Sequence, residues 1–443
     1  MRFSRLSISA SLALALAAPS LPVAAQQPAP IPAPAGVDGR AVVAEVRRII
    51  AERYVLPERR PALDAILARG LASGRYGVAD PGQLAERINA DLDNAGHDRH
   101  LNFRYDPQAA AGLAARTAQG EPDQSAYERQ ARAANHGISE LRVLPGNVRY
   151  MAYDGFMWIG PESAGALETA MRFLAGGDAV IIDLRRNGGG SPEAVQYLVS
   201  HFLPGGRPLV TFHMNGQASP DSLSTLAELP AGRMVGKPLY VLTSGGTASA
   251  AEEFTGHVGG YRIGELVGET TAGAGFRNDL VPIPGGFVLS VSVGRAVLAS
   301  TGRDWEAVGL APTMPTEVAG ALDVAHALAL RRLAAAAAPQ DRARLAAIAD
   351  GVAARGERRS PALPLAAYAG RYGERVVSVE DGRLYSRRGA RLRVALIPLG
   401  GNVFVIDNDP ALRVEFQVSA GAATAFTISA VGGPSQGPFA RNP

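Results

Sequence analysis

The sequence predicts an α/β protein in which a helical bundle precedes a central α/β core and a small all-β domain ends the chain. Three patterns support this order. Helical apolar periodicity fills much of residues 38–140, buried strands alternate with helices over 141–340, and short alternating segments occupy 360–443. A chain of 443 residues also exceeds the size of one ordinary hydrophobic core, so several domains are expected.

Residues 1–25 have the pattern of a secretory signal peptide. Arg2 and Arg5 precede an apolar run over 8–18, and small residues end the segment at Ala25. The run is shorter than the roughly 20 residues of a spanning helix, so we expect cleavage rather than anchoring. The proline-rich residues 26–37 resemble an extended tether. We therefore expect a periplasmic or secreted protein without stable membrane insertion after signal cleavage.

The composition excludes several classes of function. The chain has no cysteine, which excludes thiol catalysis, disulfides and cysteine-based zinc sites. The formal charge of +3 falls to +1 when Arg2 and Arg5 are subtracted, and no run of basic residues occurs. We therefore expect no nucleic-acid partner. No cofactor or metal is expected, and the sequence leaves a homo-oligomer open.

In residues 38–140 the first helix carries an apolar stripe over 42–50. Asp80-Pro81 supplies the cap and first position of a later helix. Apolar and polar residues then alternate over 100–105, which predicts a strand with one buried face and with His100 pointing away from it.

The core segment 141–340 contains a continuous apolar run at 179–182 and a second strand that we expect to be buried at 239–243. Such runs are typical of central strands covered on both faces. The first strand leads into the glycine-rich turn 187–190, and the second leads through another glycine-rich turn to a helix at Ser249. Ligands of α/β sheets gather at the carboxyl ends of the strands, so both turns are candidates for the site. In 360–443, short strands separated by turns predict a barrel or a sandwich.

Ser249 has two interpretations on local pattern alone. A serine where a turn meets a helix is well placed for nucleophilic attack, because the helix N-terminus stabilises a developing oxyanion. Ser249 with Glu252 three residues later also fits a helix capping box.

Four blocks in a fixed order favour the first interpretation. They read GHDRHL at 96–101, IIDLRRNGGG at 181–190, LTS at 242–244 with SAAEEF at 249–254, and VGETT at 267–271 with WEAVGLAP at 305–312. With these blocks the chain resembles the C-terminal processing (tail-specific) serine peptidases, in the branch related to tricorn protease and interphotoreceptor retinoid-binding protein. The resemblance covers roughly residues 40–335. It implies a ClpP/crotonase-like core and proteolysis of a peptide or protein substrate.

By this resemblance Ser249 is the nucleophile, and it requires a base. The dyad lysine of the family is expected about 25 residues after the serine, where this chain has Ala274. The single lysine, Lys237, begins the strand that leads to Ser249 and so belongs at the opposite end of the sheet. A Ser–Lys dyad is therefore not expected.

A histidine base remains. Asp98 and His100 match the family's Asp-x-His pattern, so the resemblance assigns His100 as the base, with His97 as the alternative. Without the family pattern, the pair could belong to a polar loop in which the histidine only makes structural hydrogen bonds. His97 and His100 could also be interpreted as a His-x-x-His metal site. This interpretation is not favoured, because the pair lacks the glutamate and the helical spacing of a zinc protease.

The resemblance also supplies the remaining parts of the centre. Glu306, beside Trp305, matches the supporting acidic residue of the tricorn-like branch. The oxyanion hole is expected to combine the N–H of Ala250 with one from the turn 187–190, taken to be that of Gly189. Taken without the resemblance, the glutamate is an ordinary loop residue and the turn a plain strand-to-helix connection.

The chain departs from the family pattern in three respects. Thr313 replaces the usual acidic residue after the proline of the fourth block, no PDZ-like segment precedes the core, and the C-terminal β-domain lies outside the resemblance. The favoured function is a metal-independent serine endopeptidase or oligopeptidase. The alternative is a non-catalytic carrier that binds an apolar ligand on the same fold.

Overall fold

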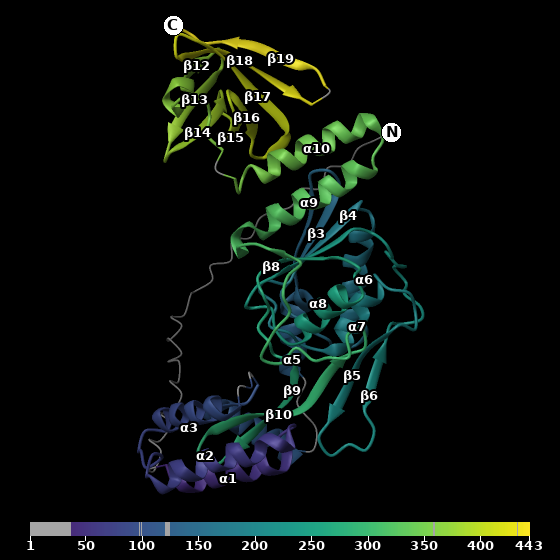
Figure 1. The fold of residues 1–443 in the computed structure, drawn as a ribbon, viewed down its shortest axis with the longest axis vertical. Helices are drawn as coiled ribbons and strands as arrows, with labels where there is room; N and C mark the ends of the chain where they lie inside the picture. Colours follow the sequence, from purple (N-terminus) through teal and green to yellow (C-terminus); the bar gives the residue numbers. More distant parts are fainter. Residues whose placement is uncertain (1–36, 97, 99, 120–124, 358, 432) are drawn as a thin grey trace, which may run out of the picture. The chain divides into compact units, whose positions relative to one another are not determined.

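The computed structural model describes residues 37–96, 98, 100–119, 125–357, 359–431 and 433–443 (Figure 1). The predicted signal peptide and most of the tether lie outside these ranges. Among the described helices, none combines the length and the apolar character needed to span a bilayer.

Three helices open the described chain, and their apolar faces share one core with a later part of the chain. They are α1 (Gly39–Arg53), α2 (Arg60–Ala72) and α3 (Pro81–Gly96). The side chain of Asp38 caps α1 by accepting hydrogen bonds from the N–H groups of Arg40 and Ala41. Ile49 and Leu84 of the helices pack in the same core as Phe287.

The strand that provides Phe287 is β10 (Phe287–Leu298), which pairs antiparallel with β1 (Asn102–Tyr105). The same sheet contains β5 (Pro208–Met214), β6 (Asp221–Ser224) and β9 (Phe276–Ile283). Strand β1 begins two residues later than predicted, so His100 precedes the strand rather than alternating within it. Between β1 and the core come α4 (Pro107–Gln119) and α5 (Ser125–Ala133).

The central sheet has the order β11-β8-β7-β4-β3-β2, and all its pairs are parallel except that of β2 with β3. Its strands are β2 (Ile138–Leu144), β3 (Val148–Tyr153), β4 (Ala179–Asp183), β7 (Leu239–Thr243), β8 (Glu265–Gly268) and β11 (Met314–Pro315).

Strands β4 and β7 are buried on both faces, as predicted. Ile182 and Val241 pack in a core shared with α6 (Pro161–Ala175), α7 (Pro192–Ser200) and α8 (Ala250–Gly260). Ile181 and Leu242 point to the opposite core, shared with α9 (Ala321–Ala336) and α10 (Pro339–Ala353). Because both faces are covered, function is confined to the edge of the sheet where the strands end.

The C-terminal part is a near-closed antiparallel barrel of eight strands, each paired with the next. They are β12 (Gly370–Tyr372), β13 (Arg375–Glu380), β14 (Arg383–Arg388), β15 (Val394–Gly400), β16 (Val403–Ile406), β17 (Asp409–Ser419), β18 (Ala422–Ala430) and β19 (Ser435–Ala440). A bridge between Tyr372 and Arg441 joins the two ends of this order, so the prediction of a small all-β domain is confirmed in its barrel form.

Candidate active site

Two turns meet at the carboxyl ends of β4 and β7, as the strand order predicts. The N–H of Ala248 donates to the carbonyl oxygen of Asn187 at 3.0 Å. The hydroxyl of Thr247 donates to the carbonyl of Leu184 at 2.8 Å, and Ser244 donates to the carbonyl of Arg185 at 2.6 Å. These bonds fix the turn before Ser249 against the turn 187–190.

Ser249 lies at the N-cap of α8 in an unusual backbone conformation. Its φ is 54° and its ψ is −120°, whereas a capping serine ordinarily has an extended backbone. Positive φ is disfavoured for residues with a side chain and persists where the surroundings impose it, most often at functional sites. The backbone of Ser249 therefore favours the interpretation as a nucleophile over that as a simple cap.

Glu252, which is fully buried, organises the backbone around Ser249. One carboxylate oxygen accepts from the N–H of Ser249 at 2.9 Å and from that of Ala274 at 2.8 Å. The other accepts from the hydroxyl of Thr271 at 2.6 Å and from the N–H of Gly273 at 2.7 Å. This glutamate thus does more than close a capping box, because it ties the loop 271–274 to the serine.

The two predicted oxyanion donors differ in their hydrogen bonding. Ala250 is the first residue of α8, and within the described part of the chain its N–H has no hydrogen-bond partner. The N–H of Gly189 donates to Oδ1 of Asn187 at 2.9 Å, and Asn187 in turn donates through Nδ2 to the carbonyl of Tyr153 at 2.7 Å. One donor is therefore available to a substrate, and the other is already engaged.

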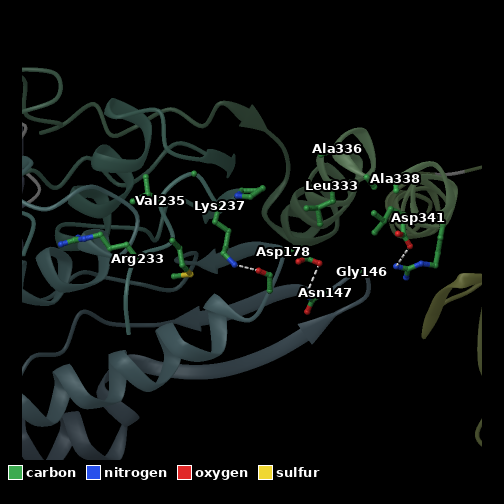
Figure 2. A pocket seen from close by; sticks show the side chains of 17 residues that line it. Gly146, Asn147, Asp178, Arg233, Val235, Lys237, Leu333, Ala336, Ala338 and Asp341 are labelled. Atoms are coloured by element: carbon green, nitrogen blue, oxygen red, sulfur yellow. Dashed lines mark hydrogen bonds and ion pairs between the residues drawn. The ribbon is translucent and has the colours of Figure 1, made fainter. Parts of the chain in front are cut away.

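A cavity of about 230 Å³ opens beside Ser249 and Ala250. Its wall includes Ala274, the position at which the resemblance leads us to expect the lysine of a Ser–Lys dyad. Lys237 is bound elsewhere: its ammonium group donates to the carbonyl of Ala175 at 2.8 Å, and it lines a second cavity beside Asp178 (Figure 2). No lysine therefore reaches the serine.

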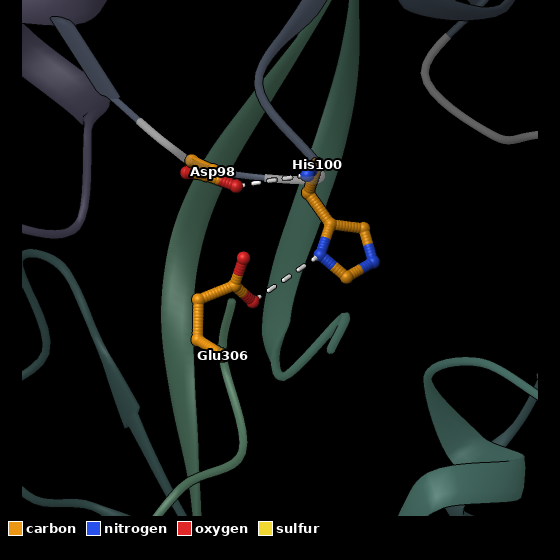
Figure 3. Close-up of side chains that lie close together, drawn as sticks. All are labelled: Asp98, His100 and Glu306. Carbon is orange, nitrogen blue, oxygen red and sulfur yellow. Dashed lines mark hydrogen bonds and ion pairs between the residues drawn. The ribbon is translucent and has the colours of Figure 1, made fainter. Parts of the chain in front are cut away.

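His100 lies beside two carboxylates, those of Asp98 and Glu306 (Figure 3). Oδ1 of Asp98 accepts from the backbone N–H of His100 at 2.8 Å, which fixes the residue that carries the ring. Nδ1 of His100 lies 3.9 Å from Oε2 of Glu306, and Nε2 points away from both carboxylates.

The electrostatic surroundings distinguish the two carboxylates. Burial raises the pKa of Asp98, and the nearby charge of Glu306 raises it further. Oε2 of Glu306 accepts from the backbone N–H groups of Gly275 at 2.6 Å and Phe276 at 2.9 Å, which fix this carboxylate beside His100. The ligand atoms of Asp98, His100 and Glu306 lie within 4.8 Å of one another, so these three residues could also hold a metal ion.

The predicted residues thus form two groups, Ser249 with Ala250 and Gly189, and Asp98 with His100 and Glu306. Among the hydrogen bonds of the described residues, none joins the hydroxyl of Ser249 to His100. The segment 275–278 connects the groups, because Gly275 and Phe276 bind Glu306 and also line the cavity of Ser249. The alternative base, His97, lies outside the described residues.

Sequence reasoning did not assign roles to Asn187 or Glu253. Asn187 stands in the glycine-rich block, and its hydrogen bond to Gly189 had no separate signal. Glu253 is buried in the wall of the cavity beside Ser249, with Oε1 3.5 Å from Nε2 of His257, and burial raises its pKa. Its position next to the capping glutamate gave no indication of this environment.

Comparisons with known proteins found family matches to the N-terminal helical part and to the central core. Residues 147–316 match the model of peptidase family S41, and residues 38–134 match that of the N-terminal domain of Peptidase_S41 in eukaryotic IRBP. A carboxyl-terminal-processing protease of Synechocystis sp. is 30% identical over 146 residues, which are 32% of this chain and 33% of the relative. The chain therefore spans about a third of the length of that curated relative.

Two solved structures are similar in part. The photosystem II D1 C-terminal processing protease has a TM-score of 0.42 and 18% identity, and the match covers 64% of this chain and 94% of that one. Tricorn protease has a TM-score of 0.38 and 10% identity, and the match covers 63% and 34%. The two consecutive family matches identify the chain as a member of the serine peptidase family S41 with an N-terminal domain of the IRBP type.

Proposed function

We propose that this protein is an exported serine peptidase that hydrolyses peptide bonds with Ser249 as its nucleophile. The observation that carries the proposal is the backbone of Ser249. Its positive φ sets the serine at the start of α8, beside a cavity and one residue before an N–H that has no partner among the described residues. Membership of family S41 supports the same reaction class.

In the proposed mechanism, Oγ of Ser249 attacks the substrate carbonyl while Nε2 of His100 takes the serine proton. The carbonyl oxygen becomes an oxyanion and accepts a hydrogen bond from the N–H of Ala250. His100 then protonates the leaving amine, the C–N bond breaks, and an acyl-enzyme remains. Water, deprotonated by His100, hydrolyses this ester and restores the serine.

Glu306 is proposed as the residue that supports His100 during these steps. A negative charge 3.9 Å from Nδ1 favours the protonated ring that forms when the serine loses its proton. His100 and Ser249 are not hydrogen-bonded to each other, and catalytic hydrogen bonds are often long before the substrate binds. The proposal requires the ring to reach Ser249 when the cavity is filled.

Gly189 is proposed as the second oxyanion donor. Its N–H is bonded to Oδ1 of Asn187, so a substrate oxygen must share or replace that bond. The turn is close enough for this role, because a Cβ on Gly189 would lie 3.1 Å from the nitrogen of Ala250.

The activity is tested with the purified mature protein and a library of internally quenched peptides. We expect hydrolysis by the wild type and by Ser191→Ala, and none by Ser249→Ala. Ser191 is a matched control, because it caps α7 after the turn 187–190 just as Ser249 stands at the cap of α8. Activity that survives in Ser249→Ala would contradict the proposed nucleophile.

Two further results separate the peptidase from its alternatives. Activity that disappears with a chelator and returns with added metal would point to chemistry at Asp98, His100 and Glu306 instead of Ser249. A folded protein that cleaves no peptide but retains an apolar ligand, with unchanged affinity in Ser249→Ala, would favour the carrier.

Export is proposed from residues 1–25 and is tested separately. N-terminal sequencing of the protein recovered from the periplasm or the medium is expected to begin at Gln26. Recovery of the uncleaved chain from the cytoplasm alone would contradict this part of the proposal.

A further inference from the structure

The interior of the C-terminal barrel is filled at one end and open at the other. Buried residues such as Leu396, Phe404, Val414 and Phe426 fill the closed end. On each of these strands, the residue two positions away toward the other end of the barrel lines a cavity of about 490 Å³. These residues are Val394, Ile406, Leu412 and Ile428. Residues two apart in a strand face the same side, so this cavity, here called the cup, is the unfilled end of the barrel interior.

Two arginines occupy inward positions in the cup. Arg375 of β13 stands directly opposite Arg388 of β14, on the face that also carries the paired Val377 and Ser386. Like charges placed opposite each other on neighbouring strands are destabilising. A third arginine, Arg391, also lines the cup. Arg388 and Arg391 are exposed, so this wall concentrates positive charge at the open end of the barrel.

The described residues compensate this charge only in part. Glu374 accepts from Nε of Arg388 at 3.2 Å, and Asp409 is the acidic residue in the lining. Nε of Arg375 is buried, and no described residue accepts its hydrogen bond. Burial lowers the pKa of Arg375, and the charges of Arg388 and Arg391 lower it further. An anion in the cup would satisfy the free donor and relieve this repulsion.

The opposite wall of the cup is apolar. Val394, Ile406, Leu412 and Ile428 provide aliphatic surface, and Leu392 at the mouth is 92% exposed. The lining thus offers a charged end and an aliphatic end within a volume typical of small-molecule sites. A ligand that matches both ends has an anionic head and an aliphatic tail.

We propose that the cup binds an amphiphilic carboxylate of the fatty-acid class, with its head on Arg375 and Arg388 and its chain against the aliphatic wall. The edge that a peptide strand could extend is short, because Tyr372 bridges to Arg441 and the N–H of Asn442 donates to the carbonyl of Arg371 at 2.7 Å, which joins β12 to the end of the chain. The near-closed ladder favours a small ligand over the tail of a protein. The proposal is independent of the chemistry at Ser249.

The test measures binding of dodecanoate to the purified full-length mature protein by titration calorimetry. Dodecanol, sodium sulfate and a peptide with an apolar C-terminal residue serve as comparison ligands. We expect dodecanoate to bind at least about tenfold more tightly than each of them, because only dodecanoate matches both the arginines and the aliphatic wall.

Variants in the same strand locate the site. Arg388→Gln is expected to weaken dodecanoate binding at least about tenfold, and Arg387→Gln to leave it within about twofold. Arg387 is exposed and adjacent, and it points to the outer face of β14. Arg375→Gln is expected to behave like Arg388→Gln, and thermal melting verifies that each variant is folded.

Several outcomes would overturn the proposal. They are absence of dodecanoate binding, equal binding of dodecanol, sulfate binding as tight as that of dodecanoate, and equal losses in Arg387→Gln and Arg388→Gln. Binding of the peptide without binding of dodecanoate would assign the cup to protein tails instead. Hydrolysis of peptides by Ser249 can succeed or fail without changing any of these results.

Discussion

Gly189 packs so closely against Ser249 that a Cβ on the glycine would lie 2.7 Å from Cβ of the serine and 2.9 Å from the carbonyl oxygen of Ala248. Gly189 also has a φ of 109°, which residues with a side chain rarely adopt. The two glycine-rich turns of the core are therefore fitted to each other at the serine. A side chain at this position would displace both the nucleophile and its neighbouring donor.

Gly189→Ala is expected to reduce kcat at least about 100-fold, because it shifts Ser249 and one oxyanion donor together. Steady-state kinetics on the best peptide substrate measures the effect. Gly188→Ala is the matched control, since a Cβ on Gly188 meets no atom within 4 Å. Comparable losses in the two variants would show that the close contact at Gly189 is not the cause.

Glu306→Gln is expected to reduce kcat about 100-fold or more while the protein stays folded. The amide oxygen can still accept from Gly275 and Phe276, but the negative charge facing Nδ1 of His100 is lost. Kinetics across pH measures the change, with the exposed Glu269→Gln as control. A loss smaller than about threefold would remove Glu306 from the proposed centre.

Glu252→Gln is expected to lower the free energy of unfolding by about 2–3 kcal/mol, because an amide cannot accept all four hydrogen bonds of the buried carboxylate. Urea unfolding measures the change. Glu193→Gln, an intermediate position at the start of α7, is expected to change the stability by no more than about 0.5 kcal/mol. Equal stability of Glu252→Gln and the wild type would contradict the proposed role of the carboxylate.

His201 predicts a specific loss of stability in acid. The side chain is fully buried, and burial lowers its pKa from 6.5 to about 4. Between these values the unfolded chain binds a proton that the folded chain does not, so this contribution to stability is complete above pH 6.5 and falls as the pH approaches 4. The loss amounts to about 3 kcal/mol at most.

Urea unfolding at pH 7 and pH 4.5 measures this loss in the wild type and in His201→Gln. The variant is expected to lose less stability between the two pH values, because its amide does not titrate. Identical losses would show that His201 does not account for the acid sensitivity. The comparison isolates one residue, since every other titratable group is present in both proteins.

The sequence was sufficient for those parts of the fold in which local pattern and burial agree. Strands β4 and β7 are predicted because both of their faces are covered, and covered strands contain apolar residues without interruption. The small all-β domain is predicted because short alternating segments are separated by turns, a pattern that left a barrel and a sandwich both open. Pairings between distant segments were not predictable. Strand β1 pairs with β10 across nearly two hundred residues, so the helical N-terminal segment shares its core with a later strand.

In the candidate site, too, some features were predictable from local pattern and others depend on the packing of distant segments. Ser249, Gly189 and Ala250 were placed together by the order of strands and turns, and Asp98-x-His100 and Glu306 were placed by resemblance to the family. The hydrogen bond from Gly189 to Asn187 and the burial of Glu253 depend on side-chain packing, for which neither pattern nor spacing contains a signal. The charged cup of the barrel also required the register of β13 and β14.

The most direct test of the account is labelling of the purified mature protein with a serine-directed fluorophosphonate. The account predicts labelling of the wild type and of Ser191→Ala, and loss of labelling in Ser249→Ala and His100→Ala. A folded wild type that stays unlabelled, or a label that persists in Ser249→Ala, would contradict the claim that Ser249 is an activated nucleophile.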